Sequence, residues 1–195
     1  MRGLRLIGLL LCSTSAFAGT VFNLSGTFNT DDQLQLFYYS VANTALVSIS
    51  TTSFATGGFS PVLTVFDSTG AFQFDNQGYG TNTDATLSWN SLAGMKYLVV
   101  LTQYDNVSPG PGYNFSDGFS EQGNGNFTAD LPFNLPTPGG SFLLPGGEQR
   151  TNQWAVTFSS DEETLTLVPE PGTVGLWLGG ITLLAAWKRR TIHRF

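Results

Sequence analysis

The chain has 195 residues, enough for one ordinary domain with extensions but too few for two full domains. Charged residues make up 11% and aromatic residues 13%, and 23 residues are Gly, a mixture too apolar for a disordered chain and too rich in Gly for a helical bundle. All 14 acidic residues lie within 19–172, where Lys96 and Arg150 are the only cations, so this stretch has a formal net charge of −12. That charge repels phosphate backbones and excludes nucleic-acid binding.

The first 18 residues have the pattern of a secretory signal peptide. A cationic start precedes an apolar run from Leu6 to Leu11, and Ala16 and Ala18 are the small residues that signal peptidase accepts around its cleavage site. We therefore expect export, with cleavage after Ala18. Cys12 would leave with the signal peptide, so the mature chain would contain no thiol and could form neither a disulfide nor a Cys-based metal site.

Residues 19–168 read as one exported, all-β domain. Short runs rich in Val, Leu, Ile, Phe, Tyr and Thr alternate with Gly, Asn and Asp clusters, at the spacing typical of a sandwich. We predict an antiparallel, jelly-roll-like β-sandwich, flanked by the signal peptide and by a single C-terminal hydrophobic helix. The expected strands are 21–28, 34–41, 45–53, 61–66, 71–74, 85–90, 97–103 and 154–158, with a ninth over 164–168.

Two strands differ in the burial that their patterns predict. In 45–53, apolar residues alternate with Ser48 and Ser50, which indicates a half-exposed strand. The continuous apolar run of 97–101 instead favours a central strand covered on both faces. Between two further runs, Asp67-Ser68-Thr69-Gly70 predicts a hairpin turn, since Asp bonds the following backbone and Gly accepts a positive φ.

Residues 105–150 form a long excursion that is rich in Gly and Pro. The segment is too long for an ordinary connection within a compact domain, so it is an elaborated surface feature or a flexible flap. Its aromatic residues could be presented to a ligand or could fold back over an open end of the sandwich. We favour the covering role for these residues, which are Tyr113, Phe115, Phe119 and Phe127.

The C-terminal segment 169–195 has three parts in a fixed order. Pro169, Glu170 and Pro171 come first, an apolar stretch follows over 173–187, and Lys188, Arg189 and Arg190 close it. Basic residues after an apolar span mark the cytoplasmic side of a membrane. The span is short at roughly 22 Å against a hydrocarbon core of ~30 Å, but we expect it to anchor the chain in the inner membrane.

This three-part order resembles the PEP-CTERM sorting signal of Gram-negative bacteria. The resemblance implies that exosortase, a membrane-embedded processing enzyme, recognises Pro169, Glu170 and Pro171 and that Lys188, Arg189 and Arg190 act as the basic stop. It also implies a place in the cell envelope, at the cell surface or outside the cell, in bacteria that make exopolysaccharide. The Pro residues suit this role physically, because they hold an extended segment with few hydrogen bonds.

Two further resemblances concern the exported domain. The run from Leu63 to Gly70, followed by Ala93-Gly94-Met95-Lys96-Tyr97, resembles bacterial pre-peptidase C-terminal β-sandwich domains over residues 34–104. The stretches 101–106 and 116–119 are similar to an uncharacterised exported-domain family that is often found ahead of PEP-type tails. That second likeness implies a location more than an activity.

Most catalytic sites are excluded by composition. His193 is the only histidine and lies beyond the apolar span, so the exported domain can build neither a Ser-His-Asp relay nor a His-ligated metal centre. A carboxylate pair for glycoside cleavage stays open, but no motif selects one. Acidic loops could bind Ca²⁺, with ligands unassigned, from a pool of Asp31, Asp32, Asp67, Asp75, Asp84, Asp105 and Asp117.

Two functions are therefore weighed. The first is a non-enzymatic protein of the cell envelope or extracellular matrix, which the two ends of the chain support. The alternative is a module that binds carbohydrate such as exopolysaccharide, with an exposed Trp89 or Trp154 stacked on sugar rings and with Ca²⁺ as a possible stabiliser. Both Trp residues fall inside expected strands, where a core position is the default.

Overall fold

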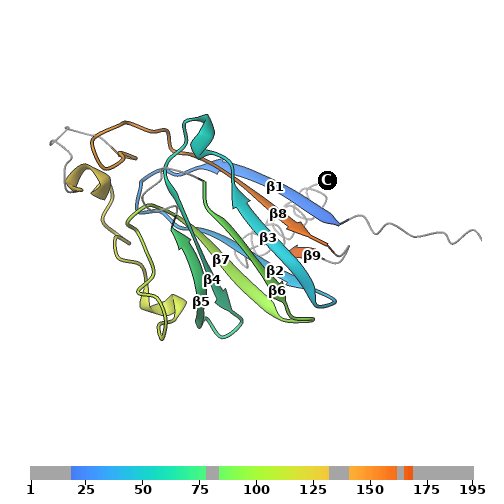
Figure 1. Ribbon diagram of the computed structural model, residues 1–195. Helices are drawn as coiled ribbons and strands as arrows, with labels where there is room; N and C mark the ends of the chain where they lie inside the picture. The colour runs from blue at the N-terminus through green and yellow to red at the C-terminus, as the bar shows by residue number, and fades with distance from the viewer. Residues whose placement is uncertain (1–18, 78–83, 132–140, 162–164, 169–195) are drawn as a thin grey trace, which may run out of the picture.

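The computed structural model describes residues 19–77, 84–131, 141–161 and 165–168, and within them the chain forms nine strands and three short 3-10 turns (Figure 1). Each expected strand is present, so the all-β prediction is confirmed. The turns are η1 (Phe54–Thr56), η2 (Phe115–Asp117) and η3 (Phe127–Asp130). The strands are β1 (Thr20–Thr27), β2 (Gln35–Val41), β3 (Ala45–Thr51), β4 (Pro61–Asp67), β5 (Phe72–Gln77), β6 (Thr86–Ser91), β7 (Lys96–Gln103), β8 (Gln153–Ser160) and β9 (Leu165–Val168).

The strands build two antiparallel sheets with the orders β1-β8-β3-β6 and β5-β4-β7-β2-β9. The first eight pair as β1 with β8, β2 with β7, β3 with β6 and β4 with β5. This is the pairing of one long hairpin whose two arms are rolled together, so that successive pairs fall in alternate sheets. The order is that of a jelly roll, and the predicted jelly-roll-like sandwich is confirmed.

The main core lies between the sheets and is built by the period-2 alternation of the strands. On β3, Val47 and Ile49 are buried while Ser48 and Ser50 face outward, as the sequence predicts. Aromatic rings fill the centre: Tyr39 of β2 contacts Phe158 of β8 at a centroid distance of 6.1 Å. Burying each large apolar side chain stabilises the fold by about 1.5–3 kcal/mol, before the entropy of ordering is subtracted.

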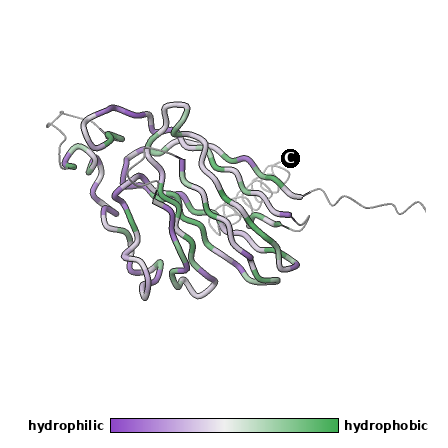
Figure 2. Tube along the Cα trace, in the orientation of Figure 1, coloured by the Kyte–Doolittle hydropathy of each residue, from purple (hydrophilic) through white to green (hydrophobic). Residues whose placement is uncertain are grey.

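A second apolar cluster lies on the outer face of the five-stranded sheet. Its buried members are Phe66 of β4, Leu98 and Val100 of β7, and Phe119 of the excursion. Strand β7 is thus buried on both faces, which confirms the interpretation of its continuous apolar run. Figure 2 shows hydrophobic residues along β4 and β7, in the middle of this sheet.

The excursion has the covering role that was favoured, but at a different place. Phe119 is buried in the second cluster and Phe115 packs on it, so this part of the segment covers the outer face of the five-stranded sheet rather than merely an open end. Phe127 is buried as well. Further along, Phe142 does enter the main core and stacks on Phe59 at 5.6 Å. Tyr113 is the exception to the covering role, with 49% of its surface exposed.

The turn between β4 and β5 has the predicted chemistry. Gly70 has φ +85°, and the Asp67 carboxylate accepts hydrogen bonds from the backbone N–H groups of Thr69 (2.8 Å) and Ala71 (3.1 Å). These bonds satisfy donors that the reversing backbone cannot pair within the ladder. Asp67-Ser68-Thr69-Gly70 is therefore a hairpin turn, as the sequence predicts.

The predicted features of the two ends lie outside the described residues. These are the signal peptide with Ala16 and Ala18, the Pro169-Glu170-Pro171 motif, the apolar span 173–187 and the basic cluster 188–190. In the part of the chain that the structure describes, no helix is long and apolar enough to cross a membrane. The predicted C-terminal anchor stays a prediction.

Candidate functional site

The predicted sorting segment leaves the fold directly from a paired edge strand. β9 is the last strand of the five-stranded sheet and pairs with β2, with Val168 opposite Tyr38 and Leu165 opposite Val41. Leu165 is buried in the main core and Leu167 packs against it. Pro169 follows at once, and Pro has no N–H to donate to a ladder, so strand pairing is expected to end at this point. The folded domain and the motif are thus contiguous.

A groove of about 280 Å³ lies at one end of the four-stranded sheet, on its outer face. β1 contributes Ser25 and Thr27, β8 contributes Gln153, and the wall opposite is Ser53 and Thr56 at η1. Gly26, Trp154 and Ala155 complete the lining. The groove therefore presents hydroxyl and amide groups, and its lining contains no ionisable side chain.

Two polar atoms of this lining are buried without a hydrogen-bond partner. They are the Ser53 hydroxyl oxygen and the Trp154 Nε1, in residues that are 3% and 8% exposed. The large majority of buried side-chain polar atoms in proteins are paired, because an unpaired one loses its hydration without compensation. The Trp154 ring lies in the main core, so of the two it is the Ser53 hydroxyl that can meet a partner supplied by solvent or by a molecule bound in the groove.

The wall formed by η1 is held in place from two sides. The Asp84 carboxylate accepts hydrogen bonds from the Thr51 hydroxyl (2.9 Å) and from the backbone N–H groups of Phe54 (3.0 Å) and Ala55 (3.4 Å). On the other side, the Arg150 guanidinium donates to the carbonyl oxygens of Gly58 (3.0 Å) and Phe54. Asp84, one of the pool of candidate calcium ligands, thus anchors this loop in the structure.

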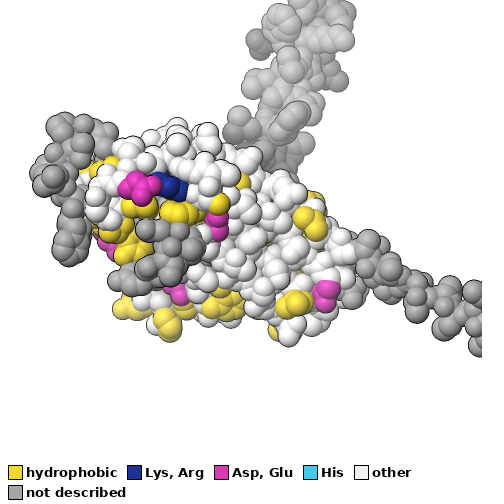
Figure 3. Space-filling model, turned by 45° about the horizontal axis from the view of Figure 1, so that its top comes forward, with side chains coloured by type: hydrophobic (Ala, Val, Ile, Leu, Met, Phe, Trp, Pro, Cys, Tyr) yellow, Lys and Arg dark blue, Asp and Glu magenta, His cyan; other side chains and the backbone are white. Residues whose placement is uncertain are grey.

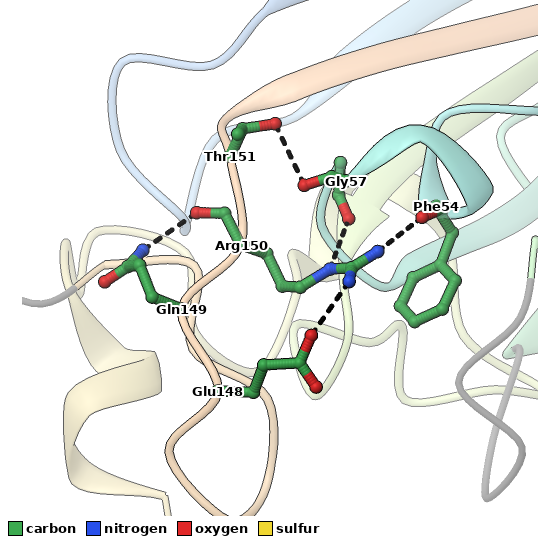
Figure 4. Close-up of polar contacts among 7 residues, drawn as sticks. Phe54, Gly57, Glu148, Gln149, Arg150 and Thr151 are labelled. Carbon is green, nitrogen blue, oxygen red and sulfur yellow. Dashed lines mark hydrogen bonds and ion pairs between the residues drawn. The ribbon is translucent and has the colours of Figure 1, made fainter.

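Arg150 makes two further contacts at the same place (Figure 4). Its guanidinium carbon lies 4.1 Å from the centroid of the Phe54 ring, and it forms an ion pair with Glu148 at 2.9 Å. The next residue, Thr151, donates from its hydroxyl to the Gly57 carbonyl at 3.1 Å. The positive charge of Arg150 is therefore committed to holding η1 against the segment before β8.

The outer face of the four-stranded sheet carries no charge. None of the strands β1, β8, β3 and β6 contains an ionisable residue, although the exported segment as a whole is strongly acidic. Neighbouring side chains bond across the strands, as Ser48 does with Ser88 (2.7 Å) and Thr157 with Asn23 (2.8 Å). Figure 3, in which the top of Figure 1 is turned toward the viewer, shows a broad white area with few hydrophobic or charged side chains.

Three other Asp residues of the candidate calcium pool also accept hydrogen bonds from the backbone of the loops. Asp31 is fully buried and accepts from the backbone N–H groups of Asn126 and Thr128, Asp32 accepts from Gly123 N–H (3.0 Å), and Asp117 accepts from Asn114 N–H (2.7 Å). Asp75 lies half-buried on β5. Among the described residues, no three His, Cys, Asp or Glu side chains gather to hold a metal ion. Calcium binding stays a prediction without a site.

A carboxylate pair does exist in the excursion, but away from the grooves described here. Burial, and secondly the charge of Glu121, raise the pKa of Asp105. A carboxyl group with a raised pKa beside a second carboxylate is the arrangement of the general acid in a glycosidase. However, Asp105 and Glu121 line neither the groove at η1 nor a second groove of about 280 Å³ beside Asp67, Lys96 and Phe115. His193 lies outside the described residues.

Of the two Trp residues considered for sugar stacking, Trp154 is buried in the main core and Trp89 is half-buried and packs against that core. Trp89 packs against Phe74 (4.8 Å) and Tyr39 (5.9 Å), and Trp154 packs edge-on against Phe37 (5.6 Å). Trp89 lies opposite the buried Val47 in the ladder, so both rings belong to the core side of the sheet. The groove was missed by sequence reasoning because its lining has no motif. The nearest sequence signal is the absence of charge from four strands of an acidic domain.

Comparison with known families confirms the interpretation of the C-terminal segment. Residues 167–190 match the model of the PEP-CTERM protein-sorting motif, a match that begins within β9 and continues into the segment after it. Among curated proteins, none matches the chain. The likeness of residues 34–104 to pre-peptidase C-terminal domains stays a prediction, with which the two-sheet fold agrees.

Proposed function

We propose, from the PEP-CTERM sorting motif at residues 167–190, that this chain is a non-enzymatic protein of the cell envelope or extracellular matrix. The motif directs sorting through exosortase to the cell envelope or surface. The proposal adds that signal peptidase removes residues 1–18, that the apolar span 173–187 holds the chain in the inner membrane, and that exosortase then releases it. β1 begins at Thr20, so cleavage after Ala18 would leave every described strand intact.

The non-enzymatic part of the proposal is supported by how the acidic residues are used. Asp31, Asp84 and Asp67 each accept several hydrogen bonds from loop backbone, so their oxygens are committed to folding. The Asp67 oxygens also accept from the Thr69 hydroxyl, and these bonds lower the pKa of Asp67, with burial opposing them. A general acid needs the opposite shift and access to substrate. The chain's architecture fits a displayed domain better than a catalyst.

The test is processing in a Gram-negative host with and without exosortase. The expected result is that the full chain accumulates in the inner membrane without exosortase, and that a shorter product appears in the outer envelope or medium with it, as mass spectrometry of each fraction would show. In the host that has exosortase, a Pro169→Ala/Pro171→Ala variant should stay unprocessed in the inner membrane, as the wild type does in the host that lacks the enzyme. Glu148→Gln, in an exposed part of the domain, is the control and should be processed normally. Normal processing of the Pro variant would contradict the proposal.

A second candidate function, carbohydrate binding, is favoured by the uncharged groove rather than by the tryptophans. A sheet face without ionisable residues loses less hydration free energy on contact than a charged one does, because neutral hydroxyl and amide groups are cheaper to dehydrate. This candidate concerns what the displayed domain does after sorting. It is compatible with the first, which concerns how the domain reaches its place.

A further inference from the structure

We infer that the groove between β1, β8 and η1 binds one sugar unit of a neutral polysaccharide, whose chain continues along the uncharged face of the four-stranded sheet. The inference rests on the second candidate function above and gives it a site, a ligand class and named residues. It does not depend on the sorting proposal.

The polar groups of the groove match a neutral, hydroxyl-rich ligand. Ser25, Thr27, Ser53 and Thr56 each carry a hydroxyl that can donate or accept, and the Gln153 amide offers both functions as well. Sugar hydroxyls have the same double capacity, so either partner can adapt to the other. The side chains of Ser25, Thr27 and Gln153 are exposed and thus accessible to a ligand.

Charge excludes the alternatives to a neutral ligand. Of the two cations among the described residues, Lys96 lines the other groove and Arg150 is bound to Phe54, Gly58 and Glu148. An anionic polymer would therefore find no cation in this groove to pair with, in a domain that is acidic as a whole. A metal ion would find no carboxylate in the lining.

An unpaired buried hydroxyl is the independent evidence for a ligand. Ser53 lines the groove, and its hydroxyl oxygen is buried without a hydrogen-bond partner. A site built for hydrogen bonding is penalised when its groups stay unpaired, and it gains that free energy back when a complementary ligand or a bound water binds. A sugar hydroxyl can donate to the Ser53 hydroxyl or accept from it.

Size and rigidity agree with a single sugar unit. A volume of about 280 Å³ lies at the lower limit for ligand pockets, so the groove suits one ring rather than an oligomer. Because Ser25, Thr27 and Gln153 belong to the outer face, the groove opens onto that face and leaves a path for the rest of a chain. Asp84 and Arg150 hold the η1 wall, so little ordering is left for the moment of binding.

The experiment uses the full chain purified in mild detergent and measures binding by isothermal titration and by retardation in gels that contain polysaccharide. The probes are two neutral glucans, dextran and laminarin, with alginate as the anionic comparison. We expect at least one neutral glucan to bind and alginate not to bind. A Thr27→Ala/Gln153→Ala variant should bind that glucan about tenfold more weakly or worse, since each lost neutral hydrogen bond weakens binding several-fold.

The matched control is Thr166→Ala/Gln73→Ala, which makes the same two changes at exposed positions of the other sheet and should leave binding unchanged. A glucan that binds the wild type and the groove variant equally would place sugar binding elsewhere and overturn the site. Equal binding of alginate would overturn the charge argument.

If no glucan binds, both this inference and the carbohydrate candidate fail, while the sorting proposal is judged by its own mass measurement. A groove variant that alters sedimentation of the protein without any glucan binding would make the face an interface between copies.

Discussion

Asp31 and Thr128 are 97 residues apart in the chain, yet the Asp31 carboxylate accepts hydrogen bonds from both the backbone N–H (3.0 Å) and the hydroxyl (2.5 Å) of Thr128. The Thr128 hydroxyl in turn accepts from the Leu143 N–H at 3.1 Å. This relay joins the loop between β1 and β2 to η3 and to the segment that leads into β8. The excursion is thus fastened to the sandwich by a buried polar network as well as by its aromatic residues.

We expect Asp31→Asn to destabilise the protein by about 1.5–3 kcal/mol. The amide keeps one acceptor oxygen but points its NH₂ group at donors, so at least one buried N–H loses its partner. The change should lower Tm by roughly 3–12 °C for a domain of this size, measured by circular dichroism. Asp130→Asn is the control, because Asp130 lies exposed on the same turn η3. An equal effect of the two substitutions would show that the network contributes nothing beyond surface charge.

Arg150 stabilises η1 through the shape of its guanidinium more than through its charge. Arg150→Lys keeps the charge but cannot donate to the Phe54 and Gly58 carbonyls in the same fork or stack on the Phe54 ring, so we expect a loss of about 1–3 kcal/mol. Glu148→Gln should cost less than about 0.5 kcal/mol, because Glu148 is 63% exposed and such pairs are well solvated. Chemical denaturation of both variants measures the difference. A larger effect of Glu148→Gln than of Arg150→Lys would contradict this account.

Much of the fold could be predicted because its signals are local. Alternation in β3, the continuous apolar run of β7 and the Asp67–Gly70 turn each reflect contacts within a few residues or a fixed face of a sheet. The position of the excursion could not be predicted in the same way. Phe119 packs on Phe66, more than fifty residues away, and an aromatic residue in a loop carries no mark of the sheet face that it will cover.

The groove depends on still longer-range contacts. Its η1 wall is fixed by Arg150, which bonds to Gly58 across 92 residues, and its lining residues are ordinary Ser, Thr and Gln positions of solvent-facing strands. The core position expected by default for the two tryptophans is confirmed, and register is the reason. A large aromatic residue in a half-buried strand faces inward or outward according to register, and the register places Trp154 opposite Gly26 with its ring against the β1 backbone.

Asp105 and Asp67 should respond to pH with opposite signs. The folded-state pKa of Asp105 is raised by burial, so its charge destabilises the fold at neutral pH, and this cost disappears as pH falls through the folded pKa. Asp105→Asn should therefore raise Tm at pH 7 by roughly 1–2 °C and have no effect near pH 3. Asn also suits the positive φ of +74° at this position.

For Asp67 the folded-state pKa is lowered, chiefly by the Thr69 hydroxyl, so its charge stabilises the fold above the ordinary pKa and the benefit is lost as pH falls through the folded value. Asp67→Asn should lower Tm at pH 7, and the difference from wild type should shrink in acid. Thermal unfolding of both variants across pH 3–7 tests the pair. Curves that shift in the same direction at pH 7 would rule out the assigned signs.

The contact between β9 and β2 is expected to limit processing of the tail. The sorting match begins inside β9, and the four residues 169–172 reach at most about 14 Å, so the folded sheet edge lies close to the place where the apolar span begins. A membrane peptidase that takes an extended segment must fit beside that edge or detach β9.

Inserting Gly-Gly-Ser-Gly-Gly-Ser between Val168 and Pro169 should therefore speed the appearance of the processed product in pulse-chase labelling. The same insertion between Gly94 and Met95, in the exposed turn before β7, is the control for a general effect of a longer chain. Unchanged processing with the first insertion would mean that exosortase reaches the motif without disturbing β9.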